Sequence, residues 1–157
     1  MKFKASEDVD APHDMVWDRF TDFSGFETDI RSRGATLNRV GNWTRTVQDV
    51  EWRGEVIVRG KSRAITAKVT QFSDKELCVI ESRIGGMKCH QEFSFVALSP
   101  VVTRVSMTLE LAADTLTARL LLQTLKLARG RVLQRLQSML VRQGNAVEAA
   151  YRRQNRG

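Results

Sequence analysis

The sequence predicts an α+β fold: a curved antiparallel sheet of about seven strands, wrapped around a long C-terminal helix, with two short helices after the first strand. Three observations predict it. Residues 35–113 alternate apolar and polar side chains with a period of two, which is typical of strands that bury one face. Residues 116–151 follow a helical period instead. The strands come in series and the long helix follows them, which favours α+β over an alternating α/β fold.

The N-terminal part predicts one strand and two short helices. Residues 2–10 alternate and indicate a half-buried strand. Pro12 suits the first position of a helix, so a short amphipathic helix is expected from there to Phe23. Gly25 ends that helix, and we expect a second brief helical turn before a polar loop at residues 31–34.

The sheet is predicted from strand signals that repeat between turns. Gly85 and Gly86 form the two-residue spacer of a tight hairpin, and Gly54 and Gly60 suggest bulges or turns. The alternation gives the sheet one apolar face. After the first strand, the predicted strands are 35–40, 43–52, 55–58, 61–72, 77–84, 87–98 and 102–112.

The C-terminal run 116–151 predicts a single amphipathic helix of roughly 50 Å, at a rise of about 1.5 Å per residue. Its first half, up to Leu127, also carries leucines away from the stripe. We therefore expect this half to be covered more fully than the second and to form the lid of a tunnel. Gly130, where the halves join, predicts a kink or a tight contact. The apolar stripe comprises Ala118, Leu121, Leu125, Val132, Leu136 and Met139.

At 157 residues the chain has the length of one domain, which we place at residues 1–151, with a frayed basic tail at 152–157. The net charge of +7 is uneven, because nine Arg and Lys stand against one acid beyond residue 114. A solvated helix face is the favoured interpretation of these cations. The alternative is weak contact with an anionic surface, such as a membrane or a protein. That contact would use Arg131, Arg135 and Arg142.

No apolar run approaches the ~18 residues of a membrane span, and the N-terminus lacks the apolar centre of a signal peptide. We therefore expect a cytoplasmic protein. Cys78 and Cys89 are expected to be small buried hydrophobic side chains, although a bridge between neighbouring strands stays open. His13 and His90 belong to no cluster with ligand spacing, so neither a metal nor a cofactor is expected.

Binding of specific nucleic acid is not expected either. Tyr151 is the only aromatic side chain beyond residue 114, so the basic helix has no platform on which bases could stack. Phosphate contacts alone would give weak binding that depends on salt.

Several short motifs, together with the final long helix, resemble one superfamily. The motifs are Val9-Asp10-Ala11-Pro12, Val16-Trp17, Asp22-Phe23, the turn Arg59-Gly60-Lys61, and the turn Leu98-Ser99-Pro100 before Thr103-Arg104-Val105. Over nearly the whole chain the pattern resembles the SRPBCC superfamily, which contains START-like lipid-transfer domains, polyketide cyclase/dehydratases and birch-pollen-allergen-type proteins. The resemblance implies the helix-grip fold, in which a curved sheet wraps the last helix and leaves an apolar tunnel. It implies no single function, because the superfamily contains enzymes, carriers and receptors.

A cyclase or dehydratase of this fold would need a titratable group inside the tunnel. The candidates are Arg63, Glu81 and Arg83, since either face of the strand that carries the last two could point inward. Glu81 and Arg83 could equally form a surface pair. Cys89 and His90 cannot share a site, because adjacent strand residues point to opposite faces. Catalysis is therefore the minor hypothesis.

The favoured hypothesis is non-enzymatic binding of a small hydrophobic or amphipathic ligand, such as a lipid or an aromatic, polyketide-like molecule, in the tunnel. Arg63 and Gln91 would be its polar anchors. The competing interpretation is a filled core without a ligand. Trp43 and Trp52 would guard the mouth of the tunnel or cap the edge of the sheet. The expected ligand-binding residues are Phe20, Arg63, Ile65, Ala67, Cys89, Gln91, Phe93, Met107, Leu109, Leu121 and Leu125.

Overall fold

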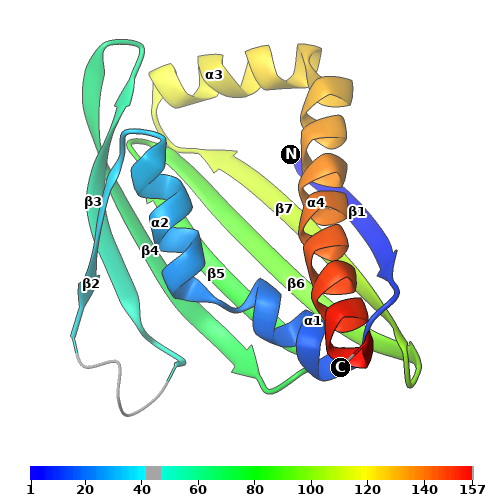
Figure 1. Ribbon diagram of the computed structural model, residues 1–157. Helices are drawn as coiled ribbons and strands as arrows, with labels where there is room; N and C mark the ends of the chain where they lie inside the picture. Colours follow the sequence, from blue (N-terminus) through cyan, green and yellow to red (C-terminus); the bar gives the residue numbers. More distant parts are fainter. Residues whose placement is uncertain (42–46, 157) are drawn as a thin grey trace.

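The computed structural model of the protein describes residues 1–41 and 47–156, which form a curved sheet with helices against its concave side (Figure 1). The helices are α1 (His13–Phe20), α2 (Phe23–Ser32), α3 (Leu116–Leu127) and α4 (Arg129–Arg156). The strands are β1 (Lys2–Val9), β2 (Thr36–Val40), β3 (Glu51–Val58), β4 (Lys61–Ser73), β5 (Leu77–Ile84), β6 (Met87–Ser99) and β7 (Val102–Ala113).

The seven strands of the described part form one antiparallel sheet in the order β1-β7-β6-β5-β4-β3-β2. The first strand of the chain pairs with the last, and every other pair of neighbours is consecutive in sequence. The amino group of Met1 also donates a hydrogen bond to the carbonyl oxygen of Leu111 at 3.0 Å. This architecture confirms the predicted α+β fold, with seven strands and two short helices after the first.

The register of β5, β6 and β7 decides which side chains face the helices. Phe93 lies opposite Cys78 on one neighbour and opposite Met107 on the other, and all three are buried on the concave face. Glu81 lies opposite His90, and both belong to the convex face. The alternation in the sequence therefore predicted the inward face of β6 correctly.

Aromatic side chains fill the core where α1 crosses the sheet. The ring of Trp17 packs against Phe72 at 5.1 Å and against Phe95 at 5.0 Å between centroids. Phe23, at the start of α2, packs edge-on against Trp52 at 5.4 Å. Trp52 is therefore a core residue, whereas Trp43, its predicted partner at the tunnel mouth, lies outside the described residues.

Helix α4 covers β1 and supplies the other side of the core. Leu140 and Val147 are buried, and Tyr151 packs against the same cluster. Gly144 faces β1 so closely that an added Cβ would lie 3.0 Å from Cγ2 of Val9. Glycine at this position thus allows α4 to pack closely on β1, since an added Cβ would require the Val9 side chain to move by a few tenths of an ångström.

The C-terminal run is two helices rather than one. The chain changes direction at Ala128, whose backbone N–H still donates to the carbonyl oxygens of Leu125 and Thr124, and α3 and α4 lie at a steep angle (Figure 1). Of the two outcomes predicted at Gly130, a kink or a tight contact, the chain does bend, two residues earlier at Ala128, but the tight contact is absent, because nothing lies within 4 Å of a Cβ built at Gly130. The two helices are held by different surfaces, α3 by the end of β7 and α4 by β1, so the chain has to turn between them.

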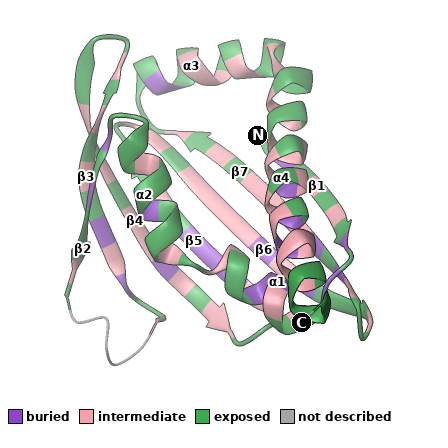
Figure 2. Cartoon of the chain, in the orientation of Figure 1, coloured by how far each residue is buried: buried purple, intermediate pink, exposed green. Residues whose placement is uncertain are grey.

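The predicted fuller coverage of the first half is also wrong. Leu116, Leu120 and Leu127 are 73%, 62% and 92% exposed, and Ala118 is the buried residue of α3. Figure 2 shows the same contrast, with buried positions on α4 and almost none on α3. Helix α3 crosses one end of the sheet instead of closing the concave face as a lid (Figure 1).

The start of α3 is fixed to the β5–β6 hairpin. The backbone N–H of Asp114 donates to the carbonyl oxygen of Gly86, and the Thr115 hydroxyl caps the helix by accepting from the N–H of Ala118. A Cβ at Gly86 would lie 2.2 Å from the Thr115 hydroxyl oxygen. The predicted two-residue hairpin is present, and its second glycine also makes room for the next helix.

Three smaller differences concern element ends. The predicted brief turn after Gly25 is the full helix α2, whose N-terminus is capped by the side chain of Asp22. Of the predicted strand 43–52, residues 43–46 lie outside the described residues and residues 47–50 form a turn instead. Residues 51–52 join the predicted strand 55–58 in one strand, β3, which runs through Gly54. Helix α4 continues to Arg156 through the predicted frayed tail. That the domain ends at residue 151 stays a prediction.

Candidate ligand-binding site

A cavity of about 520 Å³ lies between α2, α4 and the concave face of the sheet. Its position follows from the fold, because α2 and α4 cover the sheet from different sides and leave the strands between them uncovered (Figure 1). Residues of α1 and α2 in its wall are Arg19, Phe20, Asp22, Phe23, Gly25, Phe26, Asp29, Ile30 and Arg33. The sheet contributes Ile80, Gln91 and Phe93, and α4 contributes Met139 and Gln143.

The floor of the cavity is formed by β5 and β6. Gln91 and Phe93 are alternate residues of β6 and share the concave face, and Ile80 lies directly opposite Gln91 on β5. Phe20, at the end of α1, packs against Phe93 with ring centroids 6.0 Å apart. The inner part of the cavity is therefore lined by aromatic and aliphatic carbon, with one amide among it.

That amide, of Gln91, has little to bind within the protein. In the part of the chain that the structure describes, its side chain makes one contact, from Nε2 to the sulfur of Met107 at 3.6 Å. A thioether is a weak acceptor. The Gln91 side chain can therefore donate to, and accept from, a molecule placed in the cavity.

The charged groups stand at the rim. Arg19 donates from Nε to Oε1 of Gln143 at 2.7 Å, a bond that joins α1 to α4 at the mouth. On the opposite side Asp29 and Arg33 of α2 form an exposed ion pair at 3.3 Å. The cavity thus has an apolar interior and a polar entrance, which is the usual arrangement of a small-molecule site.

Three of the eleven predicted binding residues line this cavity: Phe20, Gln91 and Phe93. Met107 lies buried beside them. Ile65 and Ala67 of β4 pack against the core cluster. The remaining five are partly exposed and do not line the cavity: Arg63, Cys89, Leu109, Leu121 and Leu125.

The wall formed by α2 was not predicted. Phe26 and Ile30 lie four residues apart, a spacing that puts them on one face of a helix and could have indicated this wall. Gln143 follows no apolar pattern, so no sequence signal points to it.

The candidate catalytic residues lie elsewhere. The carboxylate of Glu81 is hydrogen-bonded to Nδ1 of His90 on the convex face. Arg83 binds Asp114 at 2.8 Å, so it anchors the start of α3. Arg63 shares the concave face with Ile65 but does not line the cavity. Of the two faces of β5 that the sequence left open, the one with Ile80 points toward the helices, so Glu81 and Arg83 do not enter the cavity.

The two cysteines are free thiols, so the bridge left open by the sequence is absent. Burial raises the pKa of the Cys78 thiol to about 11, and burial also raises the pKa of Cys89. A raised pKa keeps a thiol protonated and unreactive near neutral pH. Among the described residues, no three His, Cys, Asp or Glu side chains gather in a way that could hold a metal ion.

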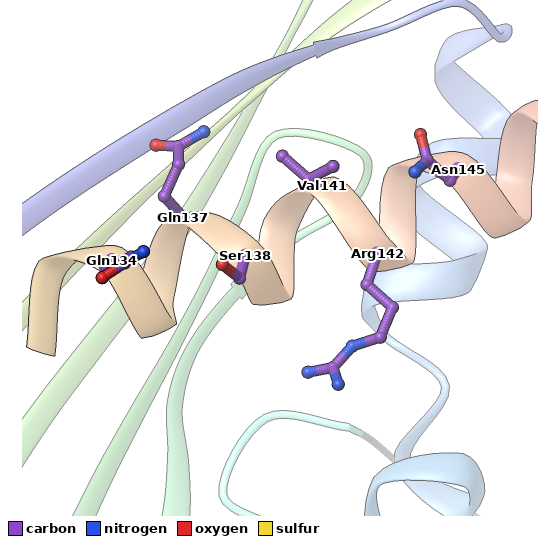
Figure 3. A pocket seen from close by; sticks show the side chains of 6 residues that line it. All are labelled: Gln134, Gln137, Ser138, Val141, Arg142 and Asn145. Carbon is purple, nitrogen blue, oxygen red and sulfur yellow. The ribbon is translucent and has the colours of Figure 1, made fainter. Parts of the chain in front are cut away.

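A second depression, of about 460 Å³, runs along the other side of α4 (Figure 3). It is lined by Gln134, Gln137, Ser138, Val141, Arg142 and Asn145, all from this one helix. The side-chain amide of Gln137 is already hydrogen-bonded within the protein, because it donates to the carbonyl oxygen of Ser6 and to the carboxylate of Glu7 on β1. Since a single helix provides its whole wall, this depression encloses a ligand less well than the cavity under α2.

No protein-family model matches the sequence, and no curated protein matches it. Solved structures do resemble the chain. The protein TTHA0849 from Thermus thermophilus matches with a TM-score of 0.64 and 19% identity, over 96% of this chain and 99% of that one. The Zhui aromatase/cyclase from Streptomyces sp. R1128 matches with a TM-score of 0.65 and 16% identity, over 94% and 93% of the two chains.

A third match is norcoclaurine synthase from Thalictrum flavum, in complex with dopamine and hydroxybenzaldehyde. Its TM-score is 0.61 at 13% identity, over 94% of this chain and 86% of that one. At such identities the likeness establishes a common fold. None of the described helices is long and apolar enough to cross a membrane.

Proposed function

Since the chain has the helix-grip fold of the SRPBCC superfamily, we propose that it binds a small hydrophobic or amphipathic molecule in the cavity between α2, α4 and the sheet, without transforming it. The observation that carries this proposal is the Gln91 amide on an otherwise apolar floor, held by one weak contact. A volume of about 520 Å³ lies within the usual range of small-ligand sites, about 300–1,000 Å³.

The structural neighbours support binding without identifying the ligand. Norcoclaurine synthase holds dopamine and hydroxybenzaldehyde, two small aromatic molecules, and the Zhui protein is an aromatase/cyclase. The aromatic walls of the cavity here, at Phe20, Phe23 and Phe93, suit a flat ligand of the same kind. A lipid chain is the other ligand that such walls would accept.

Catalysis is the less favoured hypothesis for the same site. Glu81 and Arg83 are engaged on the convex face, and the titratable side chains of the cavity wall stand exposed at its rim. A cyclase reaction would need an acid or base within hydrogen-bond reach of the bound molecule. A cytoplasmic location, expected from the sequence, stays a prediction.

Native mass spectrometry of freshly purified protein tests the proposal. We expect a co-purified molecule whose binding is abolished by Ile30→Trp, because the larger ring fills the cavity. Ile57→Trp is the matched control, since Ile57 is 63% exposed on β3. Equal loading of both variants with the same molecule would contradict the proposed site.

The role of Gln91 has its own test. Gln91→Leu keeps the size of the side chain and removes its hydrogen bonds, so we expect affinity for the identified ligand to fall about five- to tenfold in calorimetric titration. Gln71→Leu, at an exposed position on β4, makes the same chemical change away from the cavity and should leave the affinity unchanged. A ligand bound equally well by all three proteins would not contact Gln91.

A further inference from the structure

The outward side of α3 carries a row of exposed leucines. At about 100° per residue, Leu116, Leu120 and Leu127 fall within about 40° of one another around the helix axis. All three are more than half exposed. They therefore form one row, which we call the leucine ridge: Leu116 and Leu120 lie one turn apart, and Leu127 follows two turns later, beyond the exposed polar side chains of Gln123 and Thr124.

The leucine ridge does not attach α3 to the rest of the protein. The opposite side of the helix does so, with Ala118 buried and Leu121 and Leu125 half-buried toward the end of the sheet. Helix α3 is thus apolar on both sides and covered on one. Clustered exposed leucines on a folded protein often mark a contact surface, so the ridge suits contact with a second apolar surface.

Positive charge lies along one side of the leucine ridge. Arg119 and Lys126 project beside it, about 60–80° away around the axis, and Arg131 follows at the start of α4. Within the described ranges these three side chains form no ion pair. No acidic residue occurs from 115 to 147, and the preceding acid, Asp114, is neutralised by Arg83 at 2.8 Å and Lys88 at 3.6 Å.

The charge pattern decides between possible occupants. A second copy of the chain would place the cations of one α3 near those of the other. A nucleic acid would pair with the cations and leave the leucines in water. An anionic bilayer can contact both kinds of side chain: its phosphates can pair with Arg119 and Lys126, and its hydrocarbon can bury the leucines.

We propose that α3 docks on the surface of an anionic membrane, with the leucine ridge inserted below the headgroups and Arg119 and Lys126 among them. The helix lies in the plane of the interface, because its 12 residues extend about 18 Å and the hydrocarbon layer is about 30 Å thick. This surface is separate from the proposed ligand cavity, so either can hold without the other.

Flotation with lipid vesicles tests the docking. Wild-type protein should float with vesicles of phosphatidylcholine and phosphatidylserine, and much less with phosphatidylcholine alone. Changing the leucine ridge by Leu116→Gln, Leu120→Gln and Leu127→Gln together should lower the bound fraction at least about tenfold. The matched control is Ile57→Gln, Val96→Gln and Leu98→Gln, which changes three exposed apolar residues on other elements and should float like the wild type.

The charge component is tested separately. Arg119→Gln with Lys126→Gln should weaken flotation and remove most of its salt dependence, whereas Lys4→Gln with Lys61→Gln, at exposed positions of β1 and β4, should weaken it far less. A Leu120→Trp variant should show a blue shift of the added fluorescence on anionic vesicles, and Ile57→Trp should not. Circular dichroism confirms that each variant is folded.

Three results would overturn the proposal. One is flotation that is unaffected by the leucine changes. Another is a dimer in analytical ultracentrifugation that the leucine changes dissociate, without binding to vesicles, because a second copy would then cover the ridge. The last is binding to a polyanion that is as strong as binding to vesicles and independent of the leucines.

Discussion

At the scale of single residues, Gly54 lies where β2 and β3 pair so closely that a Cβ would stand 1.9 Å from the carbonyl oxygen of Thr36. The atoms in the way belong to the main chain of β2, which cannot move aside as a flexible side chain can. Gly54→Ala should therefore lower the free energy of unfolding by about 3 kcal/mol or more, measured by urea denaturation. A loss below about 1 kcal/mol would show that the two strands can separate locally.

Gly130, unlike Gly54, has open space around the position of a Cβ. Nothing lies within 4 Å of a Cβ placed there, and the residue sits in the first turn of α4. Gly130→Ala should raise the free energy of unfolding by about 0.5–1 kcal/mol, because alanine loses less backbone freedom in a helix. If the variant were less stable in the same urea experiment, the contact that the sequence predicted at this position would exist after all.

The buried thiol of Cys78 makes stability depend on alkaline pH. Its pKa rises to about 11 in the folded protein, from an ordinary value of 9.0, because burial disfavours the thiolate. Above about pH 9 the unfolded chain loses the proton that the folded protein keeps, so stability falls as the pH rises toward 11. The midpoint of urea unfolding, followed from about pH 8 to about pH 10.5, should fall more steeply for the wild type than for Cys78→Ala. Parallel curves would contradict this cause.

At the scale of elements, α2 is held to the sheet by a buried carboxylate. Glu27 is 4% exposed, and it accepts hydrogen bonds from Arg39 of β2, at 2.8 Å from Nε and 2.5 Å from Nη2. Because α2 also forms one wall of the cavity, this pair fixes the shape of the candidate site. The sequence gives no sign of it, since Glu27 lies in a polar segment and Arg39 is twelve residues away.

Glu27→Gln should lower the free energy of unfolding by about 1–3 kcal/mol, because the buried charge-assisted bonds are weakened. Hydrogen exchange of the α2 amides should become faster as well. Asp29→Asn is the matched control on the same helix; its ion pair with Arg33 is exposed, so the change should cost at most about 0.5 kcal/mol. Equal effects of the two variants would mean that Glu27 does not hold α2.

Strand alternation predicted the sheet well, and with it the floor of the site. Gln91 and Phe93 were placed on the concave face because the period of two continues unbroken through β6. The glycine at position 130 predicted a kink two residues from the observed break at Ala128, but not that one helix would end there and another begin. The apolar stripe keeps its phase from Leu125 to Val132, and the break itself contains no proline, so only the separate surfaces that hold α3 and α4 reveal it.

At the scale of the whole molecule, the two ends of the chain complete one structure. Strand β1 pairs along its length with β7, about a hundred residues later in the sequence, and α4 packs on β1 in turn. The predicted tunnel depended on α3 lying over the concave face. Helix α3 lies across the end of the sheet instead and leaves that face more open. The helical walls of the cavity therefore come from α1, α2 and α4. Local sequence patterns do not encode such long-range placement.

The folded domain ends within the last turns of α4 as far as packing is concerned. Tyr151 packs against the core, whereas residues 152–156 of α4 are exposed. A chain that ends after Tyr151 should therefore unfold within about 0.5 kcal/mol of the full chain, because only solvated side chains are lost. A chain that ends after Ala146 also loses Val147 and Tyr151, and should be less stable by about 2–4 kcal/mol. Thermal unfolding of the three chains compares them directly, and a large loss from the shorter deletion would place the end of the domain at the end of the helix.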